Sequence, residues 1–285
     1  MDITVDLKVL ARGTPGLVGA DLENLLNEAA LLAARKNKKK VSMSDIEDAK
    51  DKVMMGVERK SMILTPKEKK VTAYHEAGHA LVAYYTEGAD PVHKISIIPR
   101  GMALGITAQI PEEEKHNYQK NYLLGRLDIL MGGRCAEKII FNDTSTGAGN
   151  DIATATDISR KMVCEWGMSD RIGPLTFGKK SEEIFLGREI SHSRDYSDEI
   201  SQIIDDEISL FVKKAEDNAE NIIKTNLDDL KSIANALLEY ESISGDEMKQ
   251  VINGEPIVKI EPKEQKKRVR RRKIKIGRAS CRERV

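Results

Sequence analysis

Aromatic residues and cysteines are scarce in this chain of 285 residues. Phe, Trp and Tyr make up 4% of it, and the three cysteines are Cys135, Cys164 and Cys281. Three scattered cysteines without a CxxC spacing exclude a disulfide framework and a cysteine zinc knuckle, and they fit a reducing compartment. No apolar run approaches the roughly 18 residues of a membrane span, and the N-terminus lacks a signal-peptide pattern. We therefore expect the chain as given to be soluble.

The remaining composition favours a mainly helical protein. Apolar residues make up 40% and charged residues 32% of the chain, with abundant Ala, Leu, Glu and Lys. The formal charge of zero conceals an asymmetry, because 13 basic and 3 acidic residues follow position 258, giving a tail of +10 and a body of −10. This tail has neither a core pattern nor interleaved aromatic residues. We expect it to be disordered and solvated, with no nucleic-acid partner.

The clearest chemistry lies in the sequence His75-Glu76-Ala77-Gly78-His79. Residues 65–68, Thr-Pro-Lys-Glu, form a capping box that predicts a helix through this motif. On a helix, residues four apart share a face, so both imidazoles can bind one Zn²⁺, with Glu76 beside them as general base for a metal-activated water. Two surface histidines are the alternative for an isolated match. The apolar stripe around the motif favours the metal site.

The third zinc ligand stays open on spacing alone, because a catalytic zinc takes three protein ligands and a water. His93 lies in an expected strand and His116 in a polar segment. Glu137 lies on an amphipathic helix, where an ion pair is the alternative. Asp151 lies in the first turn of an expected helix, where an aspartate more often stabilises the helix dipole.

Periodicity predicts two helices in the first 60 residues, a β-hairpin after the histidine motif, and helices thereafter. The expected elements are helices at 21–36 and 44–56, strands at 92–98 and 104–110, a helix at 115–141 broken at Gly132-Gly133, a helix at about 151–166, a helical pair at 195–240 and a short helix at 246–254. The sequence contains no GxxxxGK[ST] phosphate-binding loop. We therefore expect that this chain cannot itself hydrolyse ATP.

Several ordered motifs resemble the FtsH family of membrane-anchored ATP-dependent zinc proteases. TPGLVGADLENLLNEAALLAAR (14–35) resembles the helical lid of an AAA ATPase, and AYHEAGHA (73–80) resembles the start of the family's peptidase domain. The resemblance continues through 90–107, 132–141, 145–152 and 167–178, and covers about residues 1–253. It implies a mainly α fold, with a helical lid at 1–60, a largely helical zinc peptidase domain with a small β-hairpin or sheet at 61–255, and a basic tail at 256–285. Residues 277–285 are unlike the family, and we treat them as a cloning or assembly scar.

The resemblance also implies residue roles. It implies an endopeptidase acting on unfolded or misfolded proteins, with one Zn²⁺ per subunit held by His75, His79 and Asp151. The aspartate matches the family's STGAxND motif, and Glu137 stays as runner-up or as a partner that orients a histidine. The expected substrate-binding edge strand is Gly105-Ile106-Thr107-Ala108, with an ordinary structural hairpin as the alternative.

For the full-length protein the resemblance implies a homo-hexamer on the cytoplasmic side of the plasma membrane. The ATPase core and the N-terminal membrane helices that the family carries upstream are absent from this chain. Two other function classes compete: an idle assembly module, in which the lid and the helical C-terminus mediate ring formation, and a nucleic-acid binder. The nucleic-acid-binding hypothesis predicts salt-dependent binding that is lost on deleting residues 259–285.

Overall fold

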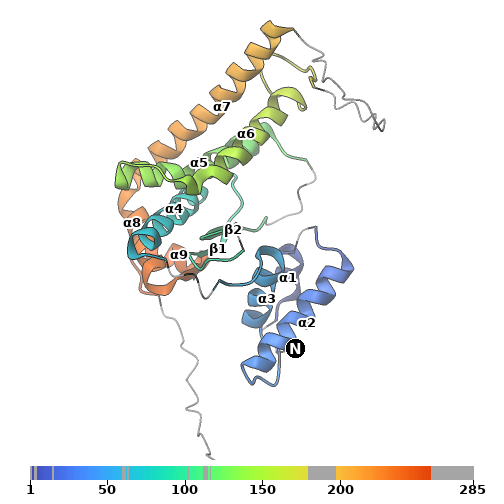
Figure 1. Ribbon diagram of the computed structural model, residues 1–285, viewed down its shortest axis with the longest axis vertical. Coiled ribbons are helices and arrows are strands. Elements are labelled where there is room, and N and C mark those ends of the chain that lie inside the picture. Colours follow the sequence, from blue (N-terminus) through green and yellow to red (C-terminus); the bar gives the residue numbers. More distant parts are fainter. Residues whose placement is uncertain are drawn as a thin grey trace, which may run out of the picture.

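The computed structural model describes residue 2 and residues 5–178 and 197–257, except 15, 60, 61, 63, 102, 112–114 and 116. Helices dominate these ranges, and one three-stranded sheet accompanies them (Figure 1). The expected fold class, mainly α with a helical lid and a small sheet, is confirmed. His116 and the basic tail from residue 258 lie outside the described residues.

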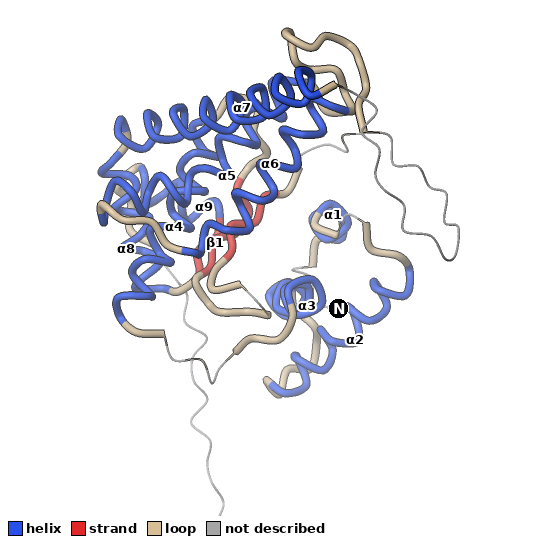
Figure 2. The backbone as a smooth tube through the Cα atoms, turned by 45° about the horizontal axis from the view of Figure 1, so that its top comes forward, coloured by secondary structure: helices blue, strands red, loops and turns tan. Residues whose placement is uncertain are grey.

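The N-terminal unit consists of α1 (Leu7–Arg12), α2 (Gly19–Arg35) and α3 (Met43–Met55) (Figure 2). It has its own small core. The buried members of that core are Leu10, Leu25, Ala29, Ile46 and Ala49. A separate core of this kind allows these three helices to pack as one body beside the rest of the chain.

The histidine motif lies on α4 (Pro66–Tyr85), the central helix of the larger unit. Its start is fixed by the expected capping box, in which Thr65 Oγ1 accepts from the Glu68 N–H at 3.2 Å and Glu68 Oε2 accepts from the Thr65 N–H at 2.8 Å. Every residue from Thr72 to Ala83 is buried. The prediction of a single buried stripe is therefore wrong, because α5 (Lys120–Phe141), α7 (Asp198–Thr225), α8 (Leu227–Tyr240) and the sheet cover this helix on several sides.

The sheet has the order β2-β1-β3 and is antiparallel throughout, with β1 (Val92–Ser96), β2 (Ile106–Gln109) and β3 (Ser242–Ser244). Ile95 of β1 pairs with Thr107 on one side and Ile243 on the other. Both expected strands exist but are shorter than predicted. β2 forms one edge of the sheet, and within the described ranges its outer side has no strand neighbour.

The second helix of the larger unit, α5 (Lys120–Phe141), runs without interruption. The predicted break at Gly132-Gly133 is wrong. A Cβ on Gly132 would lie 2.7 Å from the carbonyl oxygen of Gly78 on α4, so this glycine allows the two helices to cross in backbone contact. Close packing offsets the weak helix propensity of glycine here.

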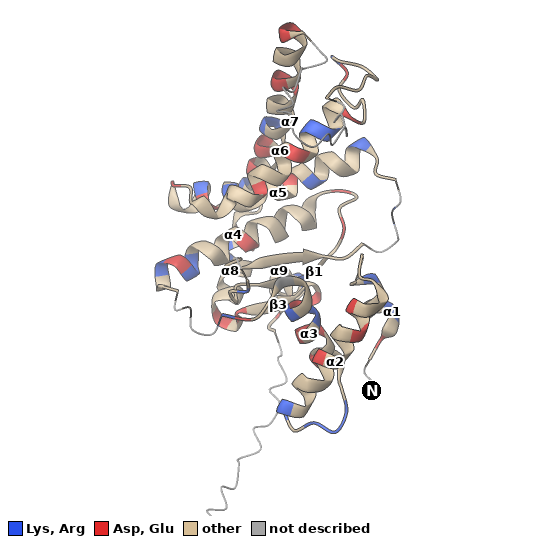
Figure 3. Cartoon of the chain, turned by 45° about the vertical axis from the view of Figure 1, so that its right-hand side comes forward, with Lys and Arg blue, Asp and Glu red and all other residues tan. Residues whose placement is uncertain are grey.

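The remaining helices are α6 (Gly149–Cys164), α7 (Asp198–Thr225), α8 (Leu227–Tyr240) and α9 (Gly245–Ile252), with a short 3₁₀ turn, η1, at Thr146–Ala148. The helical pair expected at 195–240 corresponds to α7 and α8, which meet at Asn226, and α6 ends two residues before Trp166. Acidic and basic residues lie along α7 (Figure 3). No helix in the described part of the chain is both long and apolar enough to cross a bilayer.

Charged side chains join α3 to β1 and to the turn that follows it. Lys94 Nζ lies 2.5 Å from Asp51 Oδ2, and Arg100 Nη2 lies 3.7 Å from the same oxygen. His93 Nε2 lies 3.3 Å from Glu47 Oε2. Burial raises the pKa of Glu47, but the hydrogen bonds from His93 and Lys50 outweigh it and lower this pKa to about 2. Polar contacts of this kind bind the helical unit to the sheet.

Candidate metal centre

His75 and His79 lie one turn apart on α4, and their side chains are directed toward each other. Both residues are buried, with 9% and 8% of their surface exposed. Their Nε2 atoms are 3.0 Å apart. The spacing of four residues on a helix thus brings the two imidazoles together, as the sequence predicts.

The Nδ1 atom of each histidine faces an acceptor from α5. His75 Nδ1 lies 2.7 Å from Glu137 Oε1, and His79 Nδ1 lies 2.7 Å from the carbonyl oxygen of Ile129. Because an ionised carboxylate and a carbonyl only accept, each Nδ1 carries a proton. The two Nε2 atoms are therefore the positions at which the site can receive a cation.

Asp151, in the first turn of α6, completes the cluster. Its Oδ2 lies 3.3 Å from His75 Nε2 and 3.5 Å from His79 Nε2. One ligand atom from each of the three side chains lies within 4.8 Å of the others. Two imidazole nitrogens and one carboxylate oxygen are a donor set that catalytic zinc sites use, so these residues fit a Zn²⁺ ion.

The electrostatics of the cluster favour an added positive charge. Burial lowers the pKa of His75, but hydrogen bonds to Asp151 and Glu137 outweigh this and raise it to about 10. Burial raises the pKa of Asp151, but its contacts with the two histidines outweigh this and lower it well below its usual range. The negative charge of the carboxylates around the imidazoles thus exceeds the positive charge of the protein groups there, and a divalent cation would balance it.

Three positions at a spacing of four on α5 form the wall against which both imidazoles pack: Ile129, Gly133 and Glu137. A Cβ on Gly133 would lie 2.6 Å from both His75 Cε1 and His79 Nε2, which is closer than a real Cβ approaches. The carboxylate of Glu137 is itself fixed, since its Oε2 accepts from the backbone N–H of Ser145 at 2.7 Å. Glu137 therefore lies at Nδ1 of His75, on the side away from the Nε2 cluster.

Glu76 lies next to the cluster on α4 and is buried, with 6% of its surface exposed. Burial raises the pKa of its carboxyl group. Thr107 Oγ1 of β2 donates to Glu76 Oε2 at 2.8 Å. The predicted substrate segment, residues 105–108, thus begins beside this carboxylate and continues along the edge strand.

Of the other candidates, His93 lies on β1 against Glu47 and outside the cluster. Sequence reasoning did not assign Ile129, Gly133 or Ser145 to the site, and it named Gly133 only as part of a helix break. The available signal was the spacing 129–133–137, which repeats the four-residue spacing of the histidines.

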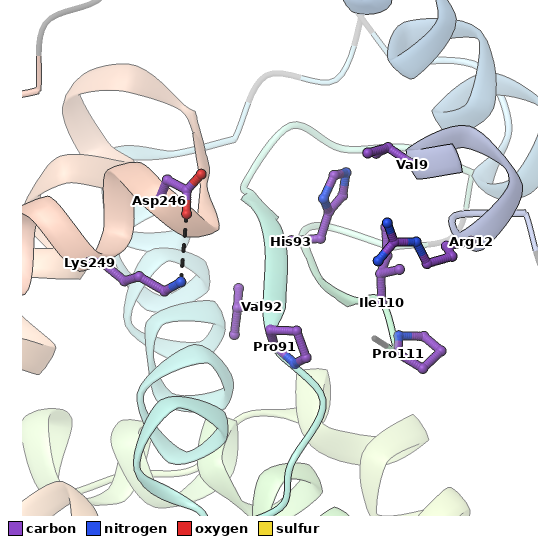
Figure 4. A pocket seen from close by; sticks show the side chains of 9 residues that line it. All are labelled: Val9, Arg12, Pro91, Val92, His93, Ile110, Pro111, Asp246 and Lys249. Carbon is purple, nitrogen blue, oxygen red and sulfur yellow. Dashed lines mark ion pairs between the residues drawn. The ribbon is translucent and has the colours of Figure 1, made fainter. Parts of the chain in front are cut away.

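A separate pocket of about 280 Å³ lies between α1, β1 and α9 (Figure 4). Its polar lining includes Arg12, His93, Asp246 and Lys249. None of the cluster residues lines it. The metal centre therefore lies outside this pocket, at a place where the side chains of His75, His79 and Asp151 contact one another directly.

The comparisons with known proteins agree with this arrangement. Residues 62–251 match the model of peptidase family M41, and residues 4–48 match the AAA+ lid domain. The chain belongs to peptidase family M41. Curated relatives named ATP-dependent zinc metalloprotease FtsH include those of Acidobacterium capsulatum, 56% identical over 90% of this chain, Myxococcus xanthus, 50% over 90%, and Magnetococcus marinus, 53% over 89%.

The chain covers 40%, 40% and 38% of the lengths of these three relatives. The predicted resemblance to the FtsH family is confirmed, and it extends over most of the chain. The M41 match spans α4 to α9 almost completely, and it includes the histidines, Glu76 and Asp151.

Proposed function

We propose that this M41 chain carries the active site of a zinc-dependent endopeptidase, with His75, His79 and Asp151 as the metal ligands. The observation that supports this most directly is the convergence of two Nε2 atoms and one carboxylate oxygen within 4.8 Å, beside a buried glutamate. A bound Zn²⁺ supplies Lewis acidity, which acidifies water and polarises a carbonyl group.

The chain's own residues then have distinct tasks. Glu76 takes a proton from the attacking water and returns it to the leaving amine, as general base and then general acid. Glu137 and the Ile129 carbonyl hold the Nδ1 protons, so that both Nε2 atoms stay directed at the ion. The outer edge of β2 offers backbone groups to an extended peptide, which suits unfolded chains of varied sequence.

Metal analysis and cleavage of casein, with and without a chelator, test this proposal. We expect one Zn²⁺ per chain and cleavage that stops on chelation and returns with added zinc. Glu76→Gln should keep the zinc and lose turnover, whereas Asp151→Ala should lose both. An Asp151→Ala variant with full zinc occupancy would contradict the ligand assignment.

The same proposal extends to the longer protein. We propose that residues 1–60 are the lid of an AAA+ ATPase and residues 61–255 its peptidase domain, and that the whole protein is a membrane-anchored hexamer at the cytoplasmic side of the plasma membrane. The relatives' names include ATP dependence, and the 285 residues contain no GxxxxGK[ST] segment. We therefore assign ATP hydrolysis to the part of the longer protein that corresponds to the uncovered length of the relatives. The absence of aromatic residues from the basic tail favours this function over nucleic-acid binding.

A further inference from the structure

The residues at the start of β2 contact the carboxylate of Glu76 from two sides. Thr107 Oγ1 lies 2.8 Å from Glu76 Oε2. Gly105, two residues earlier, approaches the other oxygen, because a Cβ at that position would lie 2.6 Å from Glu76 Oε1. Gly105 immediately precedes β2 and Thr107 is the second residue of that strand, so the segment that enters the strand lies against both oxygens of the same carboxylate.

The contact from Thr107 is specific for one oxygen. Its hydroxyl also lies 3.1 Å from the backbone carbonyl oxygen of Glu76, but it has only one proton to donate. The shorter distance and the charge of an ionised carboxylate favour Oε2 as the acceptor. Oε1 is then the oxygen without a hydrogen bond from Thr107.

We propose that Thr107 is a positioning residue for Glu76, and that it assigns different tasks to the two carboxylate oxygens. Its hydroxyl fixes Oε2, so that Oε1 accepts the proton of the attacking water. The oxygen of that water bonds to the peptide carbonyl carbon, the C–N bond breaks, and the proton passes from Oε1 to the leaving nitrogen. Gly105 keeps the space beside Oε1 free for this exchange. The inference rests on the proposed peptidase function.

A purely structural role would leave a different signature. If the hydrogen bond only tied β2 to α4, its loss would displace the edge strand on which the substrate lies, and KM would rise. If it orients Glu76, its loss would lower kcat and leave peptide binding and zinc content unchanged.

Thr107→Val removes the hydroxyl at nearly constant shape, and Thr107→Ser keeps it. We expect the valine variant to bind one zinc per chain, to bind an unstructured peptide to its zinc-free form with unchanged affinity, and to lose about 10- to 100-fold in kcat with KM within about twofold. The serine variant should recover most of this loss. A valine variant with wild-type kcat, or with raised KM alone, would overturn the inference.

Gly105→Ala provides an independent test should the valine variant fold poorly. Gly105 does not have a positive φ, so alanine adds no backbone strain and reports on the contact with the Glu76 side chain, whose Oε1, Cγ and Cδ would lie 2.6, 2.7 and 3.0 Å from the added Cβ. We expect a similar fall in kcat with zinc retained, and wild-type turnover would again overturn the inference. Gly19→Ala on α2 is the matched control, since its Cβ would meet no atom within 4 Å. A wild-type chain without chelator-sensitive cleavage would instead contradict the proposed function itself.

Discussion

The metal centre and the junction between the N-terminal unit and the sheet are both polar, but they are held in opposite ways. The metal centre depends on missing side chains: Gly78, Gly132 and Gly133 let α4 and α5 approach until the histidines meet their partners. The junction depends on long side chains, such as Lys94 and Arg100, that reach Asp51. Backbone contact fixes a distance closely, whereas ion pairs between long side chains tolerate a range of separations. We therefore expect the proposed zinc ligands to be placed more rigidly than the N-terminal unit.

Gly133→Ala is the most severe test of the backbone contact between α4 and α5. The added methyl group would lie 2.6 Å from both imidazoles, so one histidine must move away from the cluster. We expect zinc affinity to fall by more than about 100-fold, the upper end of what neighbours of metal ligands contribute. Titration with a competing chelator measures this, and Gly19→Ala is the control. A variant with wild-type zinc affinity would show that the backbone contact does not fix the site.

Glu137→Gln tests another position of the same wall with a smaller structural change. The amide keeps the shape but removes the negative charge at His75 Nδ1 and the charged acceptor for the Ser145 N–H. We expect about a 10- to 100-fold loss of zinc affinity, with the fold intact by circular dichroism. Complete loss of zinc even at saturating metal would instead point to Glu137 as a ligand.

At the junction, Asp51→Asn removes the carboxylate that Lys94 and Arg100 share. We expect the free energy of unfolding to fall by about 1–2 kcal/mol because a buried charged partner is lost, and zinc content to stay at one per chain. The difference should shrink in high salt, since Lys94 is partly exposed. Asp170→Asn is the control: Asp170 lies outside the helices and is 98% exposed in its pair with Lys120, and its loss should have no measurable effect.

The smallest expected effect concerns Asp128 of α5, whose Oδ2 accepts from Asn218 of α7 at 3.3 Å. Burial raises the pKa of Asp128 to about 6, and this hydrogen bond lowers it only in part. Because the pKa in the folded chain exceeds the usual value of about 4, this group stabilises the fold below about pH 4, and that contribution is lost as the pH rises through about 6. Asp128→Asn should raise Tm by about 1–2 °C near neutral pH. Equal shifts at about pH 4 and at neutral pH would indicate changed packing instead.

The local features of the fold were predictable from the sequence. Two examples are the capping box at Thr65 and Glu68 and the spacing of His75 and His79. Each of these features involves residues only three or four positions apart. Asp151 lies 72 residues beyond His79 in the numbering, and the spacing alone did not select it over Glu137. Only the resemblance to a family identified it, because its place in the cluster depends on how α6 packs against α4 and α5.

The errors have the same origin. Glycine is a weak helix former, so the sequence predicted a helix break at Gly132-Gly133. Gly132 in fact contacts Gly78, which lies on a different helix. The burial of residues 72–83 of α4 likewise reflects contacts with α5, α7 and α8, which come later in the sequence. β3 joins the sheet from about 150 residues away from β1. Local periodicity carries none of this information.

The wall formed by Ile129, Gly133 and Glu137 also constrains how the chain can change in length. The Ile129 carbonyl faces His79, Gly133 lies against both imidazoles, and the Glu137 carboxylate faces His75. Together the three positions span about two turns of α5. One inserted residue between positions 129 and 137 would rotate the later position by about 100° and advance it by about 1.5 Å, which removes either the carbonyl or the carboxylate from its imidazole. Side chains elsewhere on these turns can vary, but the number of residues between the two histidine partners cannot.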